Sequence, residues 1–560
     1  MSIVEVSARW RYMIWLGLAL AWFLFIELTF SLGSPFHPDE FQGAHAVYRL
    51  TNELPYRDFL PYKTVLGYYI QLPPFLLLGP GWSGLTAARI VATLINLVAL
   101  GALALALGRR YRPEAVAVGM VLLVFVSTFV DQAFEIRVDM LTGWCGVLAL
   151  LLLLNARHGS AGMAAGLAFL ISQKGLFFVI AGAIAIAASV LWESRRKHAL
   201  SGLIRFAVAA GFVIVSYLAL WIAVAGFEDV LFITFPAAAG IARRAVYDGI
   251  ELRWARTAFR NPLFYAIAVL GTVHAAIRAW RKLRARGGGE SAGGARDAKL
   301  AVFTATLLIQ MAAYPQPWSY FFLLAIPVLA VCVVDILDAI LADERRSSWK
   351  GVAVAGLVVF GVFYPTVFTL SSLHGDRERQ RITFETGLSA LGPGDTYWAG
   401  SNVFADRQQP NGLEWLDLFN LERLRNLPVE ERRGLMAELA AEPPAIVIDN
   451  YRMRSLPEPF RRFIESHYAY LANGVYSYAV ALEEGADSIA IPIRGVFRLE
   501  GPGPVHLGGQ RLLPGQTMNL PRRTIRVETP SAATLQFVGG LDVGPAPSRA
   551  EGTAGFFGVD

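Results

Sequence analysis

Long apolar stretches recur along the first two thirds of the chain, and they constrain the fold more than any other feature. A membrane-spanning helix needs about 20 apolar residues. Stretches near that length lie at 12–30, 85–108, 114–130, 140–156, 161–173, 175–192, 201–225, 261–280, 300–314, 320–341 and 351–371. The chain is 55% hydrophobic and only 17% charged, whereas soluble domains carry about 25% charged residues. We therefore predict an α-helical polytopic membrane protein with about 11 transmembrane helices.

Basic residues gather in alternate loops and predict the orientation of these spans. Arg109-Arg110, Arg195-Arg196-Lys197 and Arg345-Arg346 fall on the same side as Arg9 and Arg11. Cytoplasmic loops carry the excess of Lys and Arg, so this side and the N-terminus are predicted to be cytoplasmic. An odd number of spans then puts the C-terminus outside. The predicted external side also holds the first loop, 31–84, with interfacial helices, and a second long loop, 226–260.

The last third of the chain has a different character. Its apolar runs are short, and turn residues separate strand-like stretches at 496–499, 524–527 and 534–537. We predict two domains: a transmembrane domain over 1–371, and an external soluble α/β domain with a β-rich end over 372–560. Cys145 and Cys332 both lie in apolar runs, so neither a disulfide framework nor a metal-binding cysteine cluster is expected.

Acidic residues on the predicted external side are the first candidates for chemistry. Asp39 and Glu40 directly follow the first span, on a segment that Pro35 and Pro38 interrupt. They fit a catalytic base, and equally the cap of the next helix. Asp139 begins an apolar helix, and a carboxylate at that depth in a membrane is a functional candidate by default. The alternative for Asp139 is an N-cap or a structural pair with Arg137.

Basic residues on the same side form a second candidate group, although positive charge there runs against the usual loop bias. The group comprises Lys63, Arg89, Lys174, Arg243 and Arg244. Each residue alone fits a solvated loop or a lipid headgroup contact. Together they predict an anionic ligand at the membrane surface, and a phosphate fits because Lys and Arg supply charge-assisted hydrogen bonds to its oxygens.

A base, a buried carboxylate and phosphate-binding cations beside a bilayer favour one chemistry. The tail of a lipid-linked phosphosugar would stay in the membrane. A carboxylate would deprotonate an acceptor hydroxyl, which would attack the anomeric carbon while Lys or Arg stabilised the leaving phosphate. A single displacement of this kind inverts the anomeric configuration.

Over residues 10–370 the order of these motifs resembles the GT-C fold membrane glycosyltransferases that use polyprenyl-phosphate sugars, related to the protein O-mannosyltransferase and lipid A aminoarabinose transferase families. The resemblance implies Asp39 as the base, Lys63 at the donor phosphate and Asp139 in a second acidic role. It also implies that Tyr320, at the start of a late helix, reaches the donor. Similar short motifs are Ala88-Arg89-Ile90 and Ser172-Gln173-Lys174-Gly175.

The sequence departs from this pattern at two places. Gln42 stands where the lipid A enzyme has an arginine, three positions after the base, and Thr64-Val65 stand where that family often has prolines. Arg243 and Arg244 are candidates to replace the missing positive charge. Both departures argue against assigning the lipid A substrate to this chain.

The predicted function is an inverting glycosyltransferase of the bacterial inner (plasma) membrane. Its donor is a polyprenyl-phosphate sugar, and its acceptor is a lipid, a glycan or a protein. No metal, cofactor or nucleic acid is expected. The alternatives are a glycan ligase or polymerase using a lipid diphosphate, a transporter or flippase, and a structural protein whose external domain does the work. A transporter predicts ionisable residues at mid-span beside broken helices. A structural role predicts that Asp39→Asn and Lys63→Ala are silent.

Overall fold

The computed structural model describes residues 3–61, 63–192, 196–237, 240, 250–285, 292–314, 318–342, 347–371, 375–539 and 556. The chain divides into two compact units. The first unit comprises Met1–Gly33, Leu50–Leu77 and Thr86–His374. The second comprises Ser34–Arg49, Leu78–Leu85 and Gly375–Asp560. Part of the first predicted loop therefore groups with the C-terminal third of the chain.

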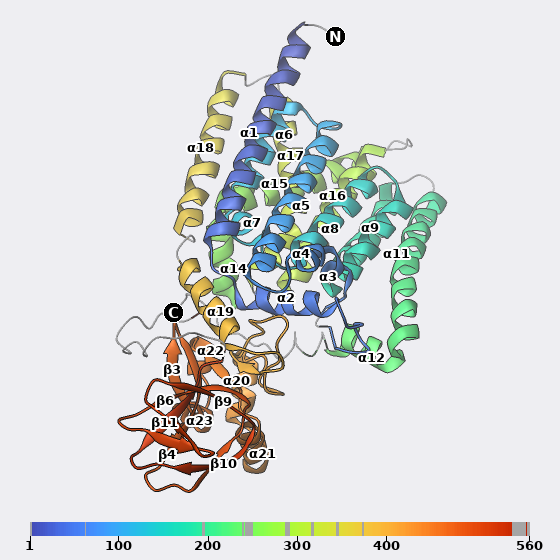
Figure 1. Ribbon diagram of the computed structural model, residues 1–560. Coiled ribbons are helices and arrows are strands. Elements are labelled where there is room, and N and C mark those ends of the chain that lie inside the picture. The colour runs from blue at the N-terminus through green and yellow to red at the C-terminus, as the bar shows by residue number, and fades with distance from the viewer. Residues whose placement is uncertain are drawn as a thin grey trace. The chain divides into compact units, whose positions relative to one another are not determined.

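Each of the 11 predicted spans is helical in the structure, and Figure 1 labels most of these helices. These helices are α1 (Ile3–Gly33), α5 (Trp82–Gly108), α6 (Pro113–Val124), α8 (Asp139–Leu154), α9 (His158–Ile171), α10 (Leu176–Ser189), α11 (Arg196–Ala225), α15 (Pro262–Arg284), α16 (Ala292–Ala312), α17 (Phe322–Ala342) and α18 (Ser347–Ser371). Among the described residues, five helices are long and apolar enough to cross a membrane: α1, α5, α11, α15 and the segment Ser319–Ala342 that contains α17. The chain is a multi-pass integral membrane protein.

Short helices connect these spans within the first unit. They are α3 (Leu66–Gln71), α4 (Pro73–Leu78), α7 (Ser127–Gln132), α12 (Phe227–Phe232), α14 (Ile250–Phe259), and the single turns η1 (Gln173–Gly175), η2 (Val190–Trp192), η3 (Ile233–Ala237) and η4 (Ser319–Phe321). Within the first loop, α3 and α4 are six-residue helices, and α4 begins at Pro73.

The span predicted over 114–130 is broken into α6 and α7. The break lies between Val124 and Ser127, where the sequence has neither proline nor glycine. Asn261 provides the reason, because its Oδ1 accepts from the Ser127 backbone N–H at 2.9 Å and its Nδ2 donates to Ser127 Oγ at 2.8 Å. The side chain of a residue far along the chain therefore satisfies the backbone group that the break exposes.

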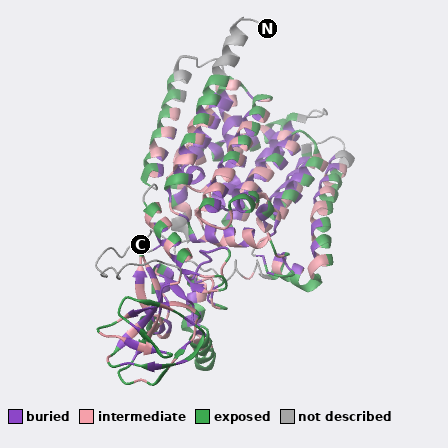
Figure 2. Cartoon of the chain, viewed as in Figure 1, coloured by how far each residue is buried: buried purple, intermediate pink, exposed green. Residues whose placement is uncertain are grey.

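Helix α17 lies at the centre of the helical unit. In its most apolar stretch 89% of the residues are buried, against 17% in α11. It packs against α6, α8 and α15. Figure 2 shows the buried residues concentrated on the inner faces of these helices. Gly143 of α8 allows close packing here, because a Cβ at this position would lie 2.5 Å from the Leu323 carbonyl oxygen.

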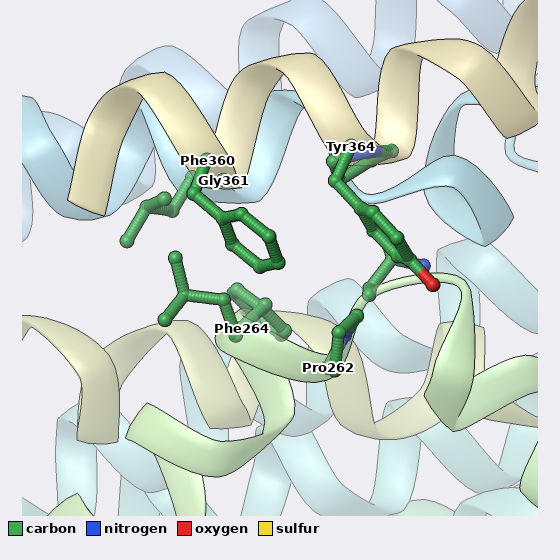
Figure 3. Close-up of a pocket in the computed structure, with 9 residues that line it drawn as sticks. Pro262, Phe264, Phe360, Gly361 and Tyr364 are labelled. Atoms are coloured by element: carbon green, nitrogen blue, oxygen red, sulfur yellow. The ribbon is translucent and has the colours of Figure 1, made fainter. Parts of the chain in front are cut away.

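A narrow recess separates α15 from α18. Figure 3 shows Phe264 of α15 facing Phe360 and Tyr364 of α18, whose rings stack with centroids 5.3 Å apart. Leu122 and Asn261 also line this recess. Its lining includes none of the predicted site residues, so the candidate site is sought elsewhere.

The second unit contains helices and two β-sheets. Its helices are α2 (Pro38–Arg49), α19 (Arg377–Ala390), α20 (Leu418–Arg425), α21 (Val429–Ala441), α22 (Tyr451–Arg454) and α23 (Glu458–His467). Its strands are β1 (Tyr397–Trp398), β2 (Ile446–Ile448), β3 (Tyr468–Ala472), β4 (Val475–Leu482), β5 (Ser488–Ile491), β6 (Gly495–Glu500), β7 (Val505–Leu507), β8 (Gln510–Leu512), β9 (Thr517–Leu520), β10 (Arg523–Glu528) and β11 (Ala533–Phe537).

The larger sheet has the order β1-β2-β4-β11-β6-β9, with β3 paired to β4, and the smaller has the order β5-β10-β7-β8. Only β1 and β2 run parallel; the other pairs among the described strands are antiparallel. The predicted β-rich end is therefore present.

Candidate functional site

Asp139 is the centre of a buried cluster of charged side chains in the helical unit. Its side chain is completely buried at the first turn of α8. The Lys174 Nζ atom lies 2.5 Å from Asp139 Oδ1, and the Lys63 Nζ atom lies 3.3 Å from Oδ2. Two predicted site residues, Lys63 and Lys174, thus meet on the carboxylate of a third. Arg137, the alternative structural partner of Asp139, forms an ion pair with Glu135.

A tight turn places Lys174 beside this carboxylate. Lys174 lies in η1, between α9 and α10, and its backbone N–H donates to Ser172 Oγ at 3.4 Å. The next residue, Gly175, folds against the end of α9. A Cβ at Gly175 would lie 2.1 Å from the carbonyl carbon of Ala168, so only glycine fits. The turn requires this close backbone approach.

Hydrogen bonds hold the loop that carries Lys63 at the two residues that follow it, Thr64 and Val65. Thr64 Oγ1 donates to the Phe169 carbonyl oxygen of α9 at 2.8 Å. The Val65 backbone N–H donates to the Tyr217 hydroxyl of α11 at 3.0 Å, and that hydroxyl lies 2.8 Å from the Tyr56 hydroxyl. Tyr56 has a φ of 67°, a value that side-chain-bearing residues rarely adopt. These contacts set the position of Lys63 from two spans.

Aromatic rings form one wall of the cluster. The guanidinium carbon of Arg137 lies 4.2 Å from the centre of the Tyr320 ring. The Lys174 Nζ atom lies 4.0 Å from the centre of the Phe321 ring and 4.8 Å from that of Tyr320. Cations at these distances are attracted by the ring quadrupole. Tyr320 therefore lies beside two cations of the cluster, and its contact with the donor stays a prediction.

The cluster has an excess of positive charge. It contains the cations Lys63, Lys174 and Arg137, and the carboxylates Asp139 and Glu135. Both lysine side chains retain some exposure, 21% for Lys63 and 13% for Lys174, whereas that of Asp139 has none. An incoming ligand would therefore meet the ammonium groups and not the carboxylate. This arrangement suits an anionic group such as a phosphate.

Burial changes the proton affinity of Lys174, which lies in the turn between two spans. Removal from water lowers the pKa of Lys174 to about 8, although the neighbouring Asp139 acts in the opposite direction. Lys63 also lowers this pKa, because the two cations repel. Lys174 therefore carries its charge at neutral pH and loses it in mildly alkaline solution.

Of the other three predicted phosphate-binding residues, the structure describes only Arg89. Arg89 of α5 is 1% exposed, and it contacts the Ser31 carbonyl oxygen at 3.4 Å and the Phe134 ring at 4.9 Å. These contacts join α5 to α1 and to the segment before α8. Arg243 and Arg244 lie outside the described residues. For all three, a ligand-binding role stays a prediction.

Asp39 and Glu40 belong to the second unit, in the first turn of α2. Glu40 is completely buried, and its Oε1 accepts from the His37 backbone N–H at 2.9 Å, which is the helix-capping contact. The Asp39 side chain is 32% exposed, and its Oδ2 lies 3.9 Å from His37 Nδ1. The Asp39 side chain is thus partly exposed, while the described contact of Glu40 caps its own helix. A catalytic role for either stays a prediction.

Some residues around the cluster could not be identified from the sequence. Tyr217 lies inside an apolar span, and its contact with Val65 crosses 152 positions. Phe321 is one of many phenylalanines. A tyrosine within an apolar span is unusual, and this could have indicated that Tyr217 has a polar partner. A glycine directly after Lys174 could have indicated a tight turn that fixes the lysine.

Comparison with known solved structures shows that the chain has a GT-C-like fold, the fold of the membrane glycosyltransferases that it resembles. The chain is similar to the ArnT protein of Cupriavidus metallidurans, solved with undecaprenyl phosphate bound, with a TM-score of 0.55 and 13% identity over 83% of this chain and 97% of that one.

The chain is also similar to the oligosaccharyltransferase of Archaeoglobus fulgidus in its apo form. This match has a TM-score of 0.50 and 12% identity, and covers 83% of this chain and 74% of that one. Comparisons with models of protein families and with curated protein sequences found no match. At these identities the likeness is one of fold.

Proposed function

We propose that this protein is an inverting glycosyltransferase that moves a sugar from a polyprenyl-phosphate donor to an acceptor hydroxyl on the external face of the membrane. The observation that carries the proposal is the buried cluster in which Asp139 holds Lys63 and Lys174. Its excess positive charge at the start of an apolar helix suits a phosphate whose lipid tail remains in the bilayer.

The proposed reaction is a single displacement. Asp39 removes the proton from the acceptor hydroxyl, and the oxygen attacks the anomeric carbon of the donor. The bond between that carbon and the phosphate oxygen breaks, and its electron pair stays on the phosphate. Lys63 and Lys174 stabilise the charge that develops there. Asp139 accounts for the position of both ammonium groups, and Tyr320 contacts the donor.

The solved relatives support the donor class. The ArnT protein of Cupriavidus metallidurans was solved with undecaprenyl phosphate, a lipid that combines a polyprenyl tail with a phosphate. A phosphate of this kind is the group that the Lys63–Asp139–Lys174 cluster would bind. Arg89, Arg243 and Arg244 are further candidates for binding the donor, and Glu40 for orienting Asp39. The location we propose is the bacterial inner membrane, with the second unit on its outer face.

The test is a transfer assay in proteoliposomes containing the full chain. Short-chain polyprenyl-phosphate sugars and one polyprenyl-diphosphate glycan would be offered in turn to the wild type, Asp39→Asn and Lys63→Ala. We expect the wild type to consume one monophosphate donor and to give a product of inverted configuration. Asp39→Asn should retain donor binding and lose turnover, whereas Lys63→Ala should weaken donor binding.

Arg57→Ala is the matched control for Lys63→Ala. Arg57 lies in the same loop, its side chain is 54% exposed, and it pairs with the adjacent Asp58. It should behave as the wild type. Equal consumption by the wild type and Asp39→Asn would reject Asp39 as the base. Turnover of the diphosphate glycan in place of the monophosphate sugars would assign the protein to the ligase class.

A further inference from the structure

The helix that carries Asp39 is built into the C-terminal third of the chain. Helix α2 follows the first span directly, yet it belongs to the compact unit formed by residues 375–560. Contacts within this unit join α2 to segments more than 340 positions away. They begin immediately before Asp39 and continue along one face of the helix.

The first contact holds the segment that enters α2. Gln380 of α19 is 2% exposed, and its amide group satisfies both backbone groups of Phe36. Gln380 Oε1 accepts from the Phe36 N–H at 2.7 Å, and Gln380 Nε2 donates to the Phe36 carbonyl oxygen at 2.9 Å. Such a two-bond contact fixes the direction of the chain as well as its position, because both donor and acceptor geometry must be met.

The second contact holds the helix itself. Ser401 Oγ donates to the carbonyl oxygen of Pro38 at 3.3 Å, and Asn402 Nδ2 donates to Gln42 Oε1 at 2.6 Å. One turn further, His45 Nδ1 lies 3.0 Å from the Ala405 carbonyl oxygen. Positions 38, 42 and 45 follow the i, i+4, i+7 spacing of one helix face. The loop 401–405 therefore lies along that face.

The loop that makes these contacts is itself fixed to the larger sheet. Gln409 Nε2 donates to Asn402 Oδ1 at 2.9 Å, and Gln409 Oε1 accepts from the Ala399 N–H, directly after β1, at 2.9 Å. Asn450 Nδ2 donates to the Ala399 carbonyl oxygen at 2.9 Å. The amide groups of Asn402 and Gln42 thus transmit the position of the sheet to α2.

Aromatic packing adds an apolar part to the same contact. The rings of Phe41 and Phe384 stack with centroids 6.3 Å apart, and Phe384 contacts Phe404 at 5.0 Å. Arg377 lies 5.0 Å from the ring of Phe36. Phe41 and Phe384 are both at most 1% exposed, so the contact removes apolar surface from water. The face of α2 that bears Phe41 is therefore occupied, while Asp39 remains partly exposed.

We propose that Gln380 and Asn402 are positioning residues for Asp39, and that one task of the C-terminal unit is to hold the base in its reactive geometry. The inference rests on the proposed function, since it takes Asp39 as the base. It also gives Gln42 a role, because Gln42 accepts the hydrogen bond from Asn402.

The test compares Gln380→Ala with Glu385→Gln in the full-length protein in proteoliposomes. Glu385 lies on the same helix, is 48% exposed and pairs with Arg381. Hydrogen exchange of the Phe36 amide should accelerate at least about 10-fold in Gln380→Ala, because its acceptor is gone. The kcat should fall about 10- to 100-fold, because small misplacements of a reacting group are costly. The donor KM should stay within about 2-fold of the wild-type value, because the substitution removes no contact that binds the donor before the reaction. Glu385→Gln should change none of these.

A double-mutant cycle on Gln42→Ala and Asn402→Ala keeps the test decisive if Gln380→Ala fails to fold. We expect the second substitution to have little further effect on kcat once the first is made, because the two side chains act through one contact. Additive losses would overturn the pairing. Unchanged exchange at Phe36, or faster exchange with unchanged kcat, would overturn the positioning role. If Asp39→Asn keeps its turnover, the proposed base fails, and the exchange data alone then show whether Gln380 holds α2.

Discussion

Replacing Asp139 with asparagine removes the counter-charge of two lysines and tests the candidate site without assuming a reaction. Asp139 is completely buried and Lys174 is 13% exposed, so neither ammonium group can simply return to water. Breaking a buried ion pair from one side costs about 3–5 kcal/mol. We expect Asp139→Asn to lose stability in this range. Asp139→Leu combined with Lys63→Met and Lys174→Met should recover most of it, because neither lysine then remains as an uncompensated charge.

The pH dependence of this loss identifies its cause. In the wild type the pKa of Lys174 is about 8, so below pH 8 the folded and unfolded chains both carry this proton. Without Asp139 the pKa of Lys174 falls further, and the folded chain binds one proton fewer than the unfolded chain. The loss of stability relative to the wild type then shrinks by about 1.4 kcal/mol per pH unit between the new pKa and pH 8.

Unfolding midpoints measured between pH 6 and 8 in the same lipid would show this dependence. Glu385→Gln, at an exposed ion pair, is the control and should change stability by at most about 1 kcal/mol. An Asp139→Asn protein as stable as the wild type at pH 6 would refute the argument. A loss that did not vary with pH would also refute it, because the lost stability would then not come from an uncompensated lysine.

Three further predictions follow from the contacts around the two units. Gly175→Ala places a Cβ 2.1 Å from the Ala168 carbonyl carbon, so it should cost at least about 1–3 kcal/mol and weaken phosphate binding, whereas Gly434→Ala, at a helical position with open space, should be neutral or stabilising in the same thermal unfolding assay. Tyr217→Phe removes the acceptor of the Val65 N–H and should speed hydrogen exchange at Val65 and lower donor affinity; unchanged exchange would show that the hydroxyl does not hold the loop. Burial lowers the pKa of His45 to about 4, below its ordinary value of 6.5, so stability should fall by about 3 kcal/mol as the pH drops from about 6.5 to 4, and His45→Gln should flatten that part of the stability–pH curve.

The helical part of the fold could be predicted because a long apolar run has few alternatives in a bilayer, where backbone groups must be satisfied within the segment. All 11 runs form helices for this reason. The break between α6 and α7 could not be predicted, since it depends on Asn261, 134 positions after Ser127. The residues around the break do not indicate such a distant partner.

The residues that form the candidate site could be predicted from the sequence, but the way in which they contact one another could not. Charge and position indicated that Asp139, Lys63 and Lys174 share one side of the membrane. Their meeting on one carboxylate depends on how the loop at Thr64 attaches to Phe169 and on the close approach at Gly175. For Glu40, the sequence left catalysis and helix capping open, and its bond to the His37 N–H matches the capping interpretation.

The order of the two units along the chain affects how the C-terminal third should be studied. The chain passes between the units five times, after Gly33, Arg49, Leu77, Leu85 and His374. Deleting residues 375–560 would therefore remove the partners of α2, and it would also remove any acceptor-binding surface that these residues form. Loss of activity in a truncated protein would not separate these two roles. Substitution of Gln380 or Asn402 does separate them, because it alters the support of Asp39 and leaves the rest of the unit in place.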